Sequence, residues 1–225
     1  MSALRLHAHR LFDGQQFHDH QVLSIEVGKI KAIDNDVSVA DVVVEGTIVP
    51  GYIDLQVNGG GGALFNDSPS LDSIKTIIAA HSKFGTTGML PTLITDKISV
   101  MQQAADAMAE AIAAKVPGIL GIHFEGPHLS VAKKGTHAQE YIRPISDEEW
   151  QILERNDIGQ ILVTLAPENV SVEDIRRMVS LGIKVCLGHT NADYKTAQAA
   201  MDAGADGYTH LFNAMSPMQG REPGV

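Results

Sequence analysis

From residue 48 onward, short apolar runs alternate with helix-length amphipathic segments, and this alternation constrains the fold more than any other feature of the chain. A buried strand followed by a helix with one apolar face is the repeating unit of a parallel α/β sheet. We therefore predict an α/β fold, a (β/α)8 barrel of the TIM type that is incomplete, because about six βα units are visible and closure takes eight. The predicted strands are Ile48–Val57, Gly88–Leu93, Ile119–Phe124, Gln160–Leu165, Lys184–Leu187 and Gly207–Leu211.

The residues before position 49 have a different pattern. Short alternating runs at Val22–Val27, Lys29–Ile33 and Val42–Val44 are separated by turn-forming residues, which is typical of β-hairpins. We expect a small N-terminal β-sandwich portion over residues 1–48 and a barrel over residues 49–225. The chain stops in a polar loop after the last predicted strand, so we expect the barrel to be truncated before its final strands.

The bulk properties exclude several classes of partner. A formal net charge of −10 opposes binding to nucleic acid and to anionic membrane surfaces. The N-terminus lacks the apolar segment of a signal peptide, and no apolar stretch approaches membrane-spanning length. The single cysteine, Cys186, lies in an apolar run and is expected to be a buried thiol. We expect a cytoplasmic protein that acts on a small molecule, with no nucleic acid or membrane partner.

Potential metal ligands stand at three places where a predicted strand gives way to a polar loop, namely Glu125, His189 and His210. The C-terminal ends of the strands are where a barrel gathers its active site. One carboxylate and two imidazoles suit a catalytic divalent metal that keeps a coordination position open for water. The pattern predicts a metal-dependent hydrolase. A plainer interpretation stays open, in which Glu125 caps a loop and the histidines are hydrogen-bonded structural residues.

Two amide side chains at the end of the first strand are weaker candidates. Gln56 and Asn58 share a face there, because side chains alternate along a strand. Their amides could hydrogen-bond a metal-bound water, or they could simply satisfy the backbone of the following loop. Since neutral amides are poorer metal ligands than imidazoles, we do not expect a second metal at this end of the pocket.

Two pairs of histidines near the N-terminus, His7-x-His9 and His18-x-His20, imitate the spacing of metal ligands. Both pairs lie in the N-terminal β unit, away from any barrel mouth. We therefore do not expect them to act as catalytic ligands.

Four segments together closely resemble those of a known family, and they are Pro50–Gly59, His123–Pro127, Leu187–Thr190 and Thr209–Met215. The family is that of the N-acetylglucosamine-6-phosphate deacetylases, within the wider amidohydrolase superfamily. The resemblance runs over essentially the whole chain. The last of the four segments, which continues to Gly224, is specific to this family.

The resemblance implies a barrel beside a small β-sandwich built from both chain ends. It also implies one divalent metal ion held by Glu125, His189 and His210, with zinc the first expectation and iron, cobalt or manganese as alternatives. Many amidohydrolases carry a His-x-His pair where this chain has Gln56 and Asn58. That departure points to the single-metal form of the family.

By the same resemblance, the reaction would convert N-acetyl-D-glucosamine 6-phosphate to D-glucosamine 6-phosphate and acetate. His137 would contact the substrate and polarise its acetamide carbonyl, Asn213 and Ala214 would hold the phosphate through amide groups, and Arg221 would pair with it. The aspartate that serves this family as general base comes from a later strand. No residue of this chain can be assigned that role.

Several alternatives to this interpretation stay open. The substrate could be a related sugar phosphate such as N-acetylgalactosamine 6-phosphate. The chain could instead be a metal- or sugar-phosphate-binding fragment without turnover, or an assembly module whose histidines are purely structural. Family resemblance also favours a homodimer or a higher homo-oligomer.

Overall fold

The computed structural model describes residues 3–225. It divides into two compact units, Met1–Tyr52 and Ile53–Val225. The predicted strand Ile48–Val57 is split in two, because Val49, Pro50 and Gly51 separate β4 (Val42–Ile48) from β5 (Tyr52–Val57). Proline has no N–H to donate to a strand ladder, which explains the interruption.

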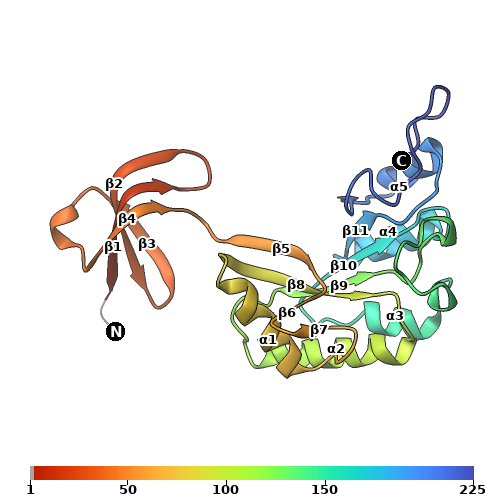
Figure 1. Cartoon of the computed structure of the whole chain (residues 1–225), viewed down its shortest axis with the longest axis horizontal. Coiled ribbons are helices and arrows are strands. Elements are labelled where there is room, and N and C mark those ends of the chain that lie inside the picture. The colour runs from red at the N-terminus through yellow and green to blue at the C-terminus, as the bar shows by residue number, and fades with distance from the viewer. Residues whose placement is uncertain (1–2) are drawn as a thin grey trace. The chain divides into compact units, whose positions relative to one another are not determined.

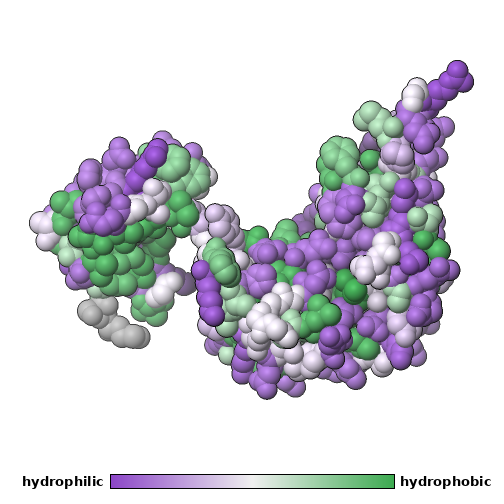
Figure 2. Space-filling view, in the orientation of Figure 1, coloured by the Kyte–Doolittle hydropathy of each residue, from purple (hydrophilic) through white to green (hydrophobic). Residues whose placement is uncertain are grey.

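The N-terminal unit is a four-stranded sheet with the strand order β3-β2-β1-β4 (Figure 1). Strands β1 (Leu4–Phe12), β2 (Phe17–Glu26) and β3 (Lys29–Asp34) form two antiparallel hairpins, and β4 pairs in parallel with β1. A short 3₁₀ turn, η1 (Val37–Val39), precedes β4. The small core is made by Ala8, Leu11 and Leu23. Figure 2 shows hydrophobic side chains gathered on the surface of this unit, where exposed apolar residues include Ile30, Ile33, Val42 and Val43.

The second unit is built on a six-stranded sheet with the order β12-β11-β10-β9-β8-β5, in which neighbouring strands from β8 to β12 pair in parallel. The prediction of an α/β barrel with about six βα units is confirmed. Beyond β5, its strands are β8 (Thr86–Ile94), β9 (Gly121–Glu125), β10 (Gln160–Leu165), β11 (Lys184–Leu187) and β12 (Gly207–Tyr208). A small hairpin of β6 (Gly59–Gly60) and β7 (Ala63–Leu64) follows β5.

Helices connect the strands, and Figure 1 shows α1 and α2 on one side of the sheet. Of the five α-helices in the part of the chain that the structure describes, four begin after a residue whose side chain accepts a hydrogen bond from the first turn, namely Ser70, Ser146, Ser171 and Asp193. No helix in residues 3–225 has the length and apolar character needed to cross a membrane. The helices are α1 (Leu71–Ser82), α2 (Ile98–Ala113), α3 (Asp147–Leu153), α4 (Val172–Ser180) and α5 (Tyr194–Asp202), with 3₁₀ turns η2 (Val131–Lys133) and η3 (Gln139–Tyr141) before α3.

Two local predictions need correction. Strand β12 ends at Tyr208 rather than Leu211, because His210 and Phe212 have φ values of 38° and 71°, which a strand cannot accommodate. Cys186 is only partly buried, whereas a fully buried thiol was expected. Burial is still sufficient to raise the pKa of this thiol above its ordinary value, so it stays protonated at neutral pH.

Candidate metal centre

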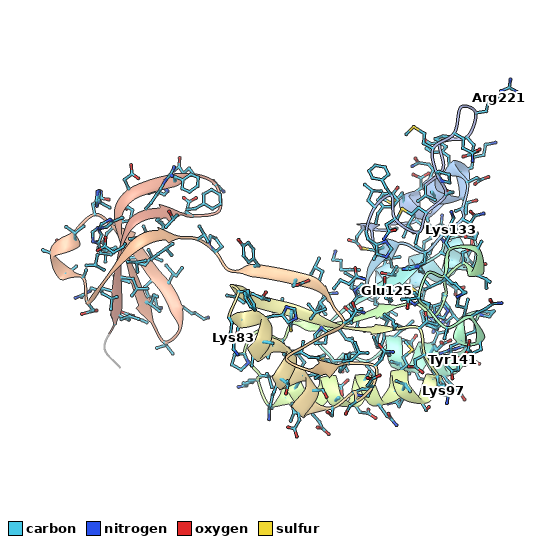
Figure 3. The ribbon with its side chains drawn as sticks, viewed as in Figure 1. Lys83, Lys97, Glu125, Lys133, Tyr141 and Arg221 are labelled. Atoms are coloured by element: carbon cyan, nitrogen blue, oxygen red, sulfur yellow. The ribbon has the colours of Figure 1, made fainter. Side chains whose placement is uncertain are left out.

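The candidate site lies where the strands of the six-stranded sheet end. Glu125 is the last residue of β9, and Figure 3 shows it at that strand end. His189 follows β11 by two residues, and His210 follows β12 by two residues. All three line a cavity of about 480 Å³, together with Gln56, Asn58, Asn66, His137, Asn213 and Ala214.

The three side chains converge on one point. Nε2 of His189 and Nε2 of His210 each lie 3.2 Å from Oε1 of Glu125, and the two nitrogens are 3.0 Å apart. The carboxylate is nearly buried, since only 4% of the Glu125 side chain is exposed, against 25% for His210. This arrangement offers one oxygen and two nitrogens to a single ion, with one side of the site still open to the cavity.

Hydrogen bonds on the far side of each imidazole fix which nitrogen faces the site. Nδ1 of His189 donates to the carbonyl oxygen of Lys133 at 2.9 Å, and Nδ1 of His210 donates to that of Asn213 at 3.0 Å. Because a carbonyl oxygen can only accept, each ring carries a hydrogen on Nδ1. When the rings are neutral, their Nε2 lone pairs therefore face each other and the Glu125 carboxylate. Positive charge between them, from a proton or from a metal ion, relieves this repulsion, so the donor set fits a divalent metal.

The backbone of both histidines has an unusual conformation. His189 has a φ of 48° and His210 a φ of 38°, in the left-handed region that residues other than glycine seldom adopt. Such conformations cost free energy and persist where the surrounding structure enforces them, often at functional sites. Here each left-handed residue turns its imidazole out of the strand direction and back over the strand ends.

The charges in the site favour a bound cation. Burial alone would raise the pKa of Glu125, but the hydrogen bond from His189 and the nearby His137 lower it to about 2. Burial would lower the pKa of His189, but its hydrogen bonds with Glu125 and with the carbonyl of Lys133 raise it. The raised pKa of His189 beside an ionised carboxylate shows that the site favours positive charge, which a metal ion would supply.

His137 stands beside the three residues with its ring fixed in the opposite sense. The backbone N–H of Thr95 donates to Nδ1 of His137 at 3.3 Å, so that nitrogen is an acceptor and Nε2 carries the hydrogen. Burial, and next the nearby His189, lower the pKa of His137 to about 4, which keeps the ring neutral at pH 7. Nε2 lies 3.9 Å from Oε2 of Glu125. His137 therefore presents an N–H donor to the same cavity, beside the Glu125 carboxylate.

A buried hydrogen-bond chain lies beneath Glu125. His123 precedes Glu125 by two residues on the same face of β9. Burial is the main cause that lowers the pKa of His123 to about 4, so the ring is neutral at pH 7. Its Nδ1 donates to the carbonyl oxygen of Leu55 at 2.9 Å. Its Nε2 must then accept the hydroxyl hydrogen of Thr164 at 2.7 Å, and Thr164 accepts from Thr209 at 2.6 Å. These bonds tie β5, β9, β10 and the end of β12 together.

Comparison with known proteins identifies the family. The model of the amidohydrolase family matches residues 47–222, which is most of the chain. The chain belongs to the amidohydrolase family. Amidohydrolases are metal-dependent, and the predicted resemblance to their N-acetylglucosamine-6-phosphate deacetylase branch is confirmed.

Curated amidohydrolases similar to this chain act on amino-sugar phosphates by name. The chain is 56% identical over 183 residues to an N-acetylgalactosamine-6-phosphate deacetylase of a Shewanella strain, covering 81% of this chain and 46% of that protein. It is 42% identical over 179 residues to an N-acetylglucosamine-6-phosphate deacetylase of Haemophilus influenzae, covering 79% of this chain and 47% of that protein. The chain thus spans about half the length of these relatives.

A solved amidohydrolase structure has the same fold over the whole chain. It is a mutant N-acetyl-D-glucosamine-6-phosphate deacetylase from Mycobacterium smegmatis, in complex with N-acetyl-D-glucosamine-6-phosphate. The TM-score is 0.91 at 32% sequence identity, and the match covers 100% of this chain and 59% of that chain.

The residues that the sequence singled out for the barrel site all line one cavity, except Arg221. Gln56, Asn58, Asn213 and Ala214 line it, although the backbone N–H of Asn213 already donates to His210 at 2.9 Å and is not free for a ligand. Arg221 is outside this set. Figure 3 shows Arg221 at the tip of the C-terminal loop, directed away from Glu125.

Sequence reasoning missed two residues of the site. Thr95 fixes the His137 ring and directly follows Ile94, the last residue of β8, so the rule that found Glu125 would have found it as well. Asn66 lines the cavity, and its side chain bonds the N–H and the carbonyl of Ile94, both at 3.0 Å. Asn66 lies in a loop after a two-residue strand, where no sequence pattern marks it.

Proposed function

We propose that the protein removes the acetyl group from N-acetyl-D-glucosamine 6-phosphate, giving D-glucosamine 6-phosphate and acetate. The observation that carries this proposal is the convergence of Glu125, His189 and His210 on one point, with the N–H of His137 presented to the same cavity. Membership of the amidohydrolase family and the names of the relatives support the same reaction. Because the chain spans about half the length of those relatives, the activity is proposed for the whole protein.

The proposed cofactor is one divalent metal ion, with zinc preferred and iron, cobalt or manganese as alternatives. Glu125, His189 and His210 would hold it, since their free lone pairs face one another. Such an ion, when bound, lowers the pKa of a water molecule and polarises a carbonyl oxygen. Gln56 and Asn58 line the same cavity and would hydrogen-bond water there without serving as ligands.

The proposed substrate contacts follow from the donors around the cavity. His137 would donate from Nε2 to the acetamide oxygen and stabilise the negative charge that develops there, which is a role for a neutral ring with a fixed tautomer. Asn213, through its side-chain amide, and Ala214 would contact the phosphate. Arg221 would pair with the phosphate only after its loop moves, or in the cavity of a second copy of the chain. Pairing in the cavity of a second copy requires the proposed homodimer or higher homo-oligomer, and measuring the mass of the protein in solution tests for that assembly.

A second candidate substrate is N-acetyl-D-galactosamine 6-phosphate. The specific observation in its favour is the 56% identity to a relative named for that substrate, compared with 42% for the relative named for the glucosamine derivative. The two sugars differ at a single hydroxyl group, so a difference in one or two hydrogen bonds would decide between them. Comparing kcat/KM for the two epimers with the same preparation identifies the substrate.

The test of the function is acetate release by the zinc-loaded protein. We expect turnover of one or both epimers and loss of at least about 100-fold in kcat/KM for Glu125→Gln, since a ligand is removed with little change in shape. Glu110→Gln, an exposed carboxylate on α2, is the matched control and should leave the rate unchanged. Stoichiometric zinc without acetate release would replace the proposal with a non-catalytic binding role. A protein that binds no metal would leave the histidines a structural role.

A further inference from the structure

A second group of histidines lies in the N-terminal unit, on strands β1 and β2. The rings of His7, His9 and His20 form a triangle with centroid separations of 5.4 Å, 5.6 Å and 5.5 Å. His7 and His9 are two apart on β1 and therefore share a face of the sheet. In the pairing of β1 with β2, Ala8 lies opposite Gln21 and Arg10 lies opposite Asp19. His9 and His20 lie between these two pairs, so they face each other across the two strands.

Two of the rings already have the spacing of ligands on one metal ion. Nδ1 of His20 lies 3.4 Å from Nε2 of His7. Two imidazole nitrogens bound to a tetrahedral zinc ion at about 2.0–2.1 Å are about 3.3 Å apart. The same distance suits a weak N–H···N hydrogen bond, which would hold the pair in this position while no metal is bound.

The backbone around the cluster departs from regular strand geometry. His20 has a φ of 53° in the middle of β2, where an extended residue would be expected. The pairing of β1 with β4 also shifts register between Ala8 and Arg10, opposite the bulged residues Glu45 and Gly46. The bulge brings Oε2 of Glu45 to 3.7 Å from Nδ1 of His9. A carboxylate thus stands at the edge of the cluster as a potential fourth ligand.

We propose that His7, His9 and His20, with Glu45, form a second metal site that binds a divalent transition-metal ion of the kind that prefers imidazole, with zinc as the reference ion. His7 and His20 supply the preformed pair, and His9 completes the set by rotation of its side chain, which is 42% exposed and has room to turn. This rotation is necessary because, among residues 3–225, only Glu125, His189 and His210 already bring three ligand atoms within 4.8 Å of one another.

The chemistry of the cluster selects the class of ion. Neutral imidazole binds zinc, copper and nickel well, whereas magnesium and calcium prefer oxygen ligands. The nearest arginine in the sequence, Arg10, does not oppose a cation here, because its guanidinium group stacks on the ring of Phe17 at 4.0 Å. The carboxylate of Glu45 would offset one of the two charges of the ion.

The test is zinc stoichiometry, measured by equilibrium dialysis of the chelator-treated full chain against Zn²⁺ and metal analysis by emission spectrometry. We expect about two zinc ions per chain for the unaltered protein. His20→Ala and His7→Ala should each reduce this to about one, and His189→Ala should remove the other ion. Combining His20→Ala with His189→Ala should abolish binding. Because the two sites are removed by different variants, failure of one proposal is distinguishable from failure of the other.

The matched control is His18→Ala. His18 lies on the same strand as His20, but its Nε2 pairs with Oδ2 of Asp13 at 2.8 Å and it stands outside the triangle. This variant should keep both ions. A second measurement is proton NMR with substoichiometric Ni²⁺, which should broaden the ring signals of His7, His9 and His20 and leave that of His18 sharp. Unchanged zinc stoichiometry in both His7→Ala and His20→Ala, or equal broadening of all four rings, would overturn the proposal.

Discussion

The hydrogen-bond chain beneath the candidate metal centre makes a prediction whose sign depends on the direction of its bonds. The carbonyl of Leu55 can only accept, so the order of donation runs from Thr209 to Thr164, then to His123, then to Leu55. Thr164 is fully buried, and Thr209 and His123 are nearly so. Replacing either threonine by valine changes the shape of the side chain little but removes the hydroxyl group.

The two valine substitutions leave different groups without a partner. Thr209→Val removes the donor to Thr164, whose oxygen keeps its bond to His123, and a partner of the weakly bonding Cys186 thiol. We therefore expect a cost of about 1 kcal/mol in the free energy of unfolding. Thr164→Val leaves the Nε2 acceptor of His123 unsatisfied, and it leaves the hydroxyl of Thr209 with only the weakly bonding thiol of Cys186 as a partner. At about 2 kcal/mol for the orphaned acceptor and about 1 kcal/mol for the bond that Thr209 loses, the expected cost is about 3 kcal/mol.

The double variant gives the sharpest result. Removing both hydroxyls leaves only Nε2 of His123 without a partner, so the double variant should lose about 2 kcal/mol and be more stable than Thr164→Val alone. Urea unfolding of the four proteins, followed by circular dichroism at pH 7, measures these differences. Equal costs for the two single variants, or a double variant at the sum of their costs, would refute the assigned order of donation.

Three further predictions concern the site and the core. Thr95→Val removes the hydroxyl 2.9 Å from Nδ1 of His137 while the backbone N–H remains, so steady-state kinetics should record a fall in kcat of about 5-fold with a smaller change in KM. Ile77→Ala, at a fully buried position of α1, should lower the free energy of unfolding by about 3 kcal/mol, measured by urea titration. The control Leu181→Ala, at a position that is 45% exposed, should change it by less than about 1 kcal/mol. In His20→Ala, which lacks the proposed second site, zinc at 100 times its dissociation constant should raise the free energy of unfolding by about 3 kcal/mol, and calorimetry should find that gain reduced when Glu125→Gln is added.

The pattern of apolar runs in the sequence correctly predicted the central strands of the parallel sheet. Strands Gln160–Leu165 and Lys184–Leu187 have the predicted bounds, because a continuous apolar run between turn signals leaves few alternatives for a buried parallel strand. The strand-end rule also brought Glu125, His189 and His210 to one cavity, although their role as metal ligands stays a prediction. Both results depend on the same physical fact, that parallel strands end at one edge of their sheet.

Where backbone conformation overrides side-chain pattern, the sequence was less informative. The run Thr209–Leu211 has the apolar and β-branched character of a strand, but the left-handed φ of His210 ends β12 before it. Arg221 has the charge and geometry to hold a phosphate, but sequence gives no direction for the loop that carries it, and the structure turns it away from Glu125. Residue type predicts neither the end of β12 nor the direction of the Arg221 loop, because both depend on the backbone conformation of loops.

The same loops explain why the candidate ligands have the correct tautomer. His189 and His210 receive their orientation from the carbonyl groups of Lys133 and Asn213, which belong to the 3₁₀ turn η2 and to the loop after β12. The side chains of Lys133 and Asn213 play no part in those two bonds. Metal affinity at this site therefore depends on the path of the backbone, which holds the two Nε2 atoms 3.0 Å apart and facing Glu125. A motif search finds the histidines, but the orientation of their rings comes from backbone carbonyl groups, which any residue type could supply.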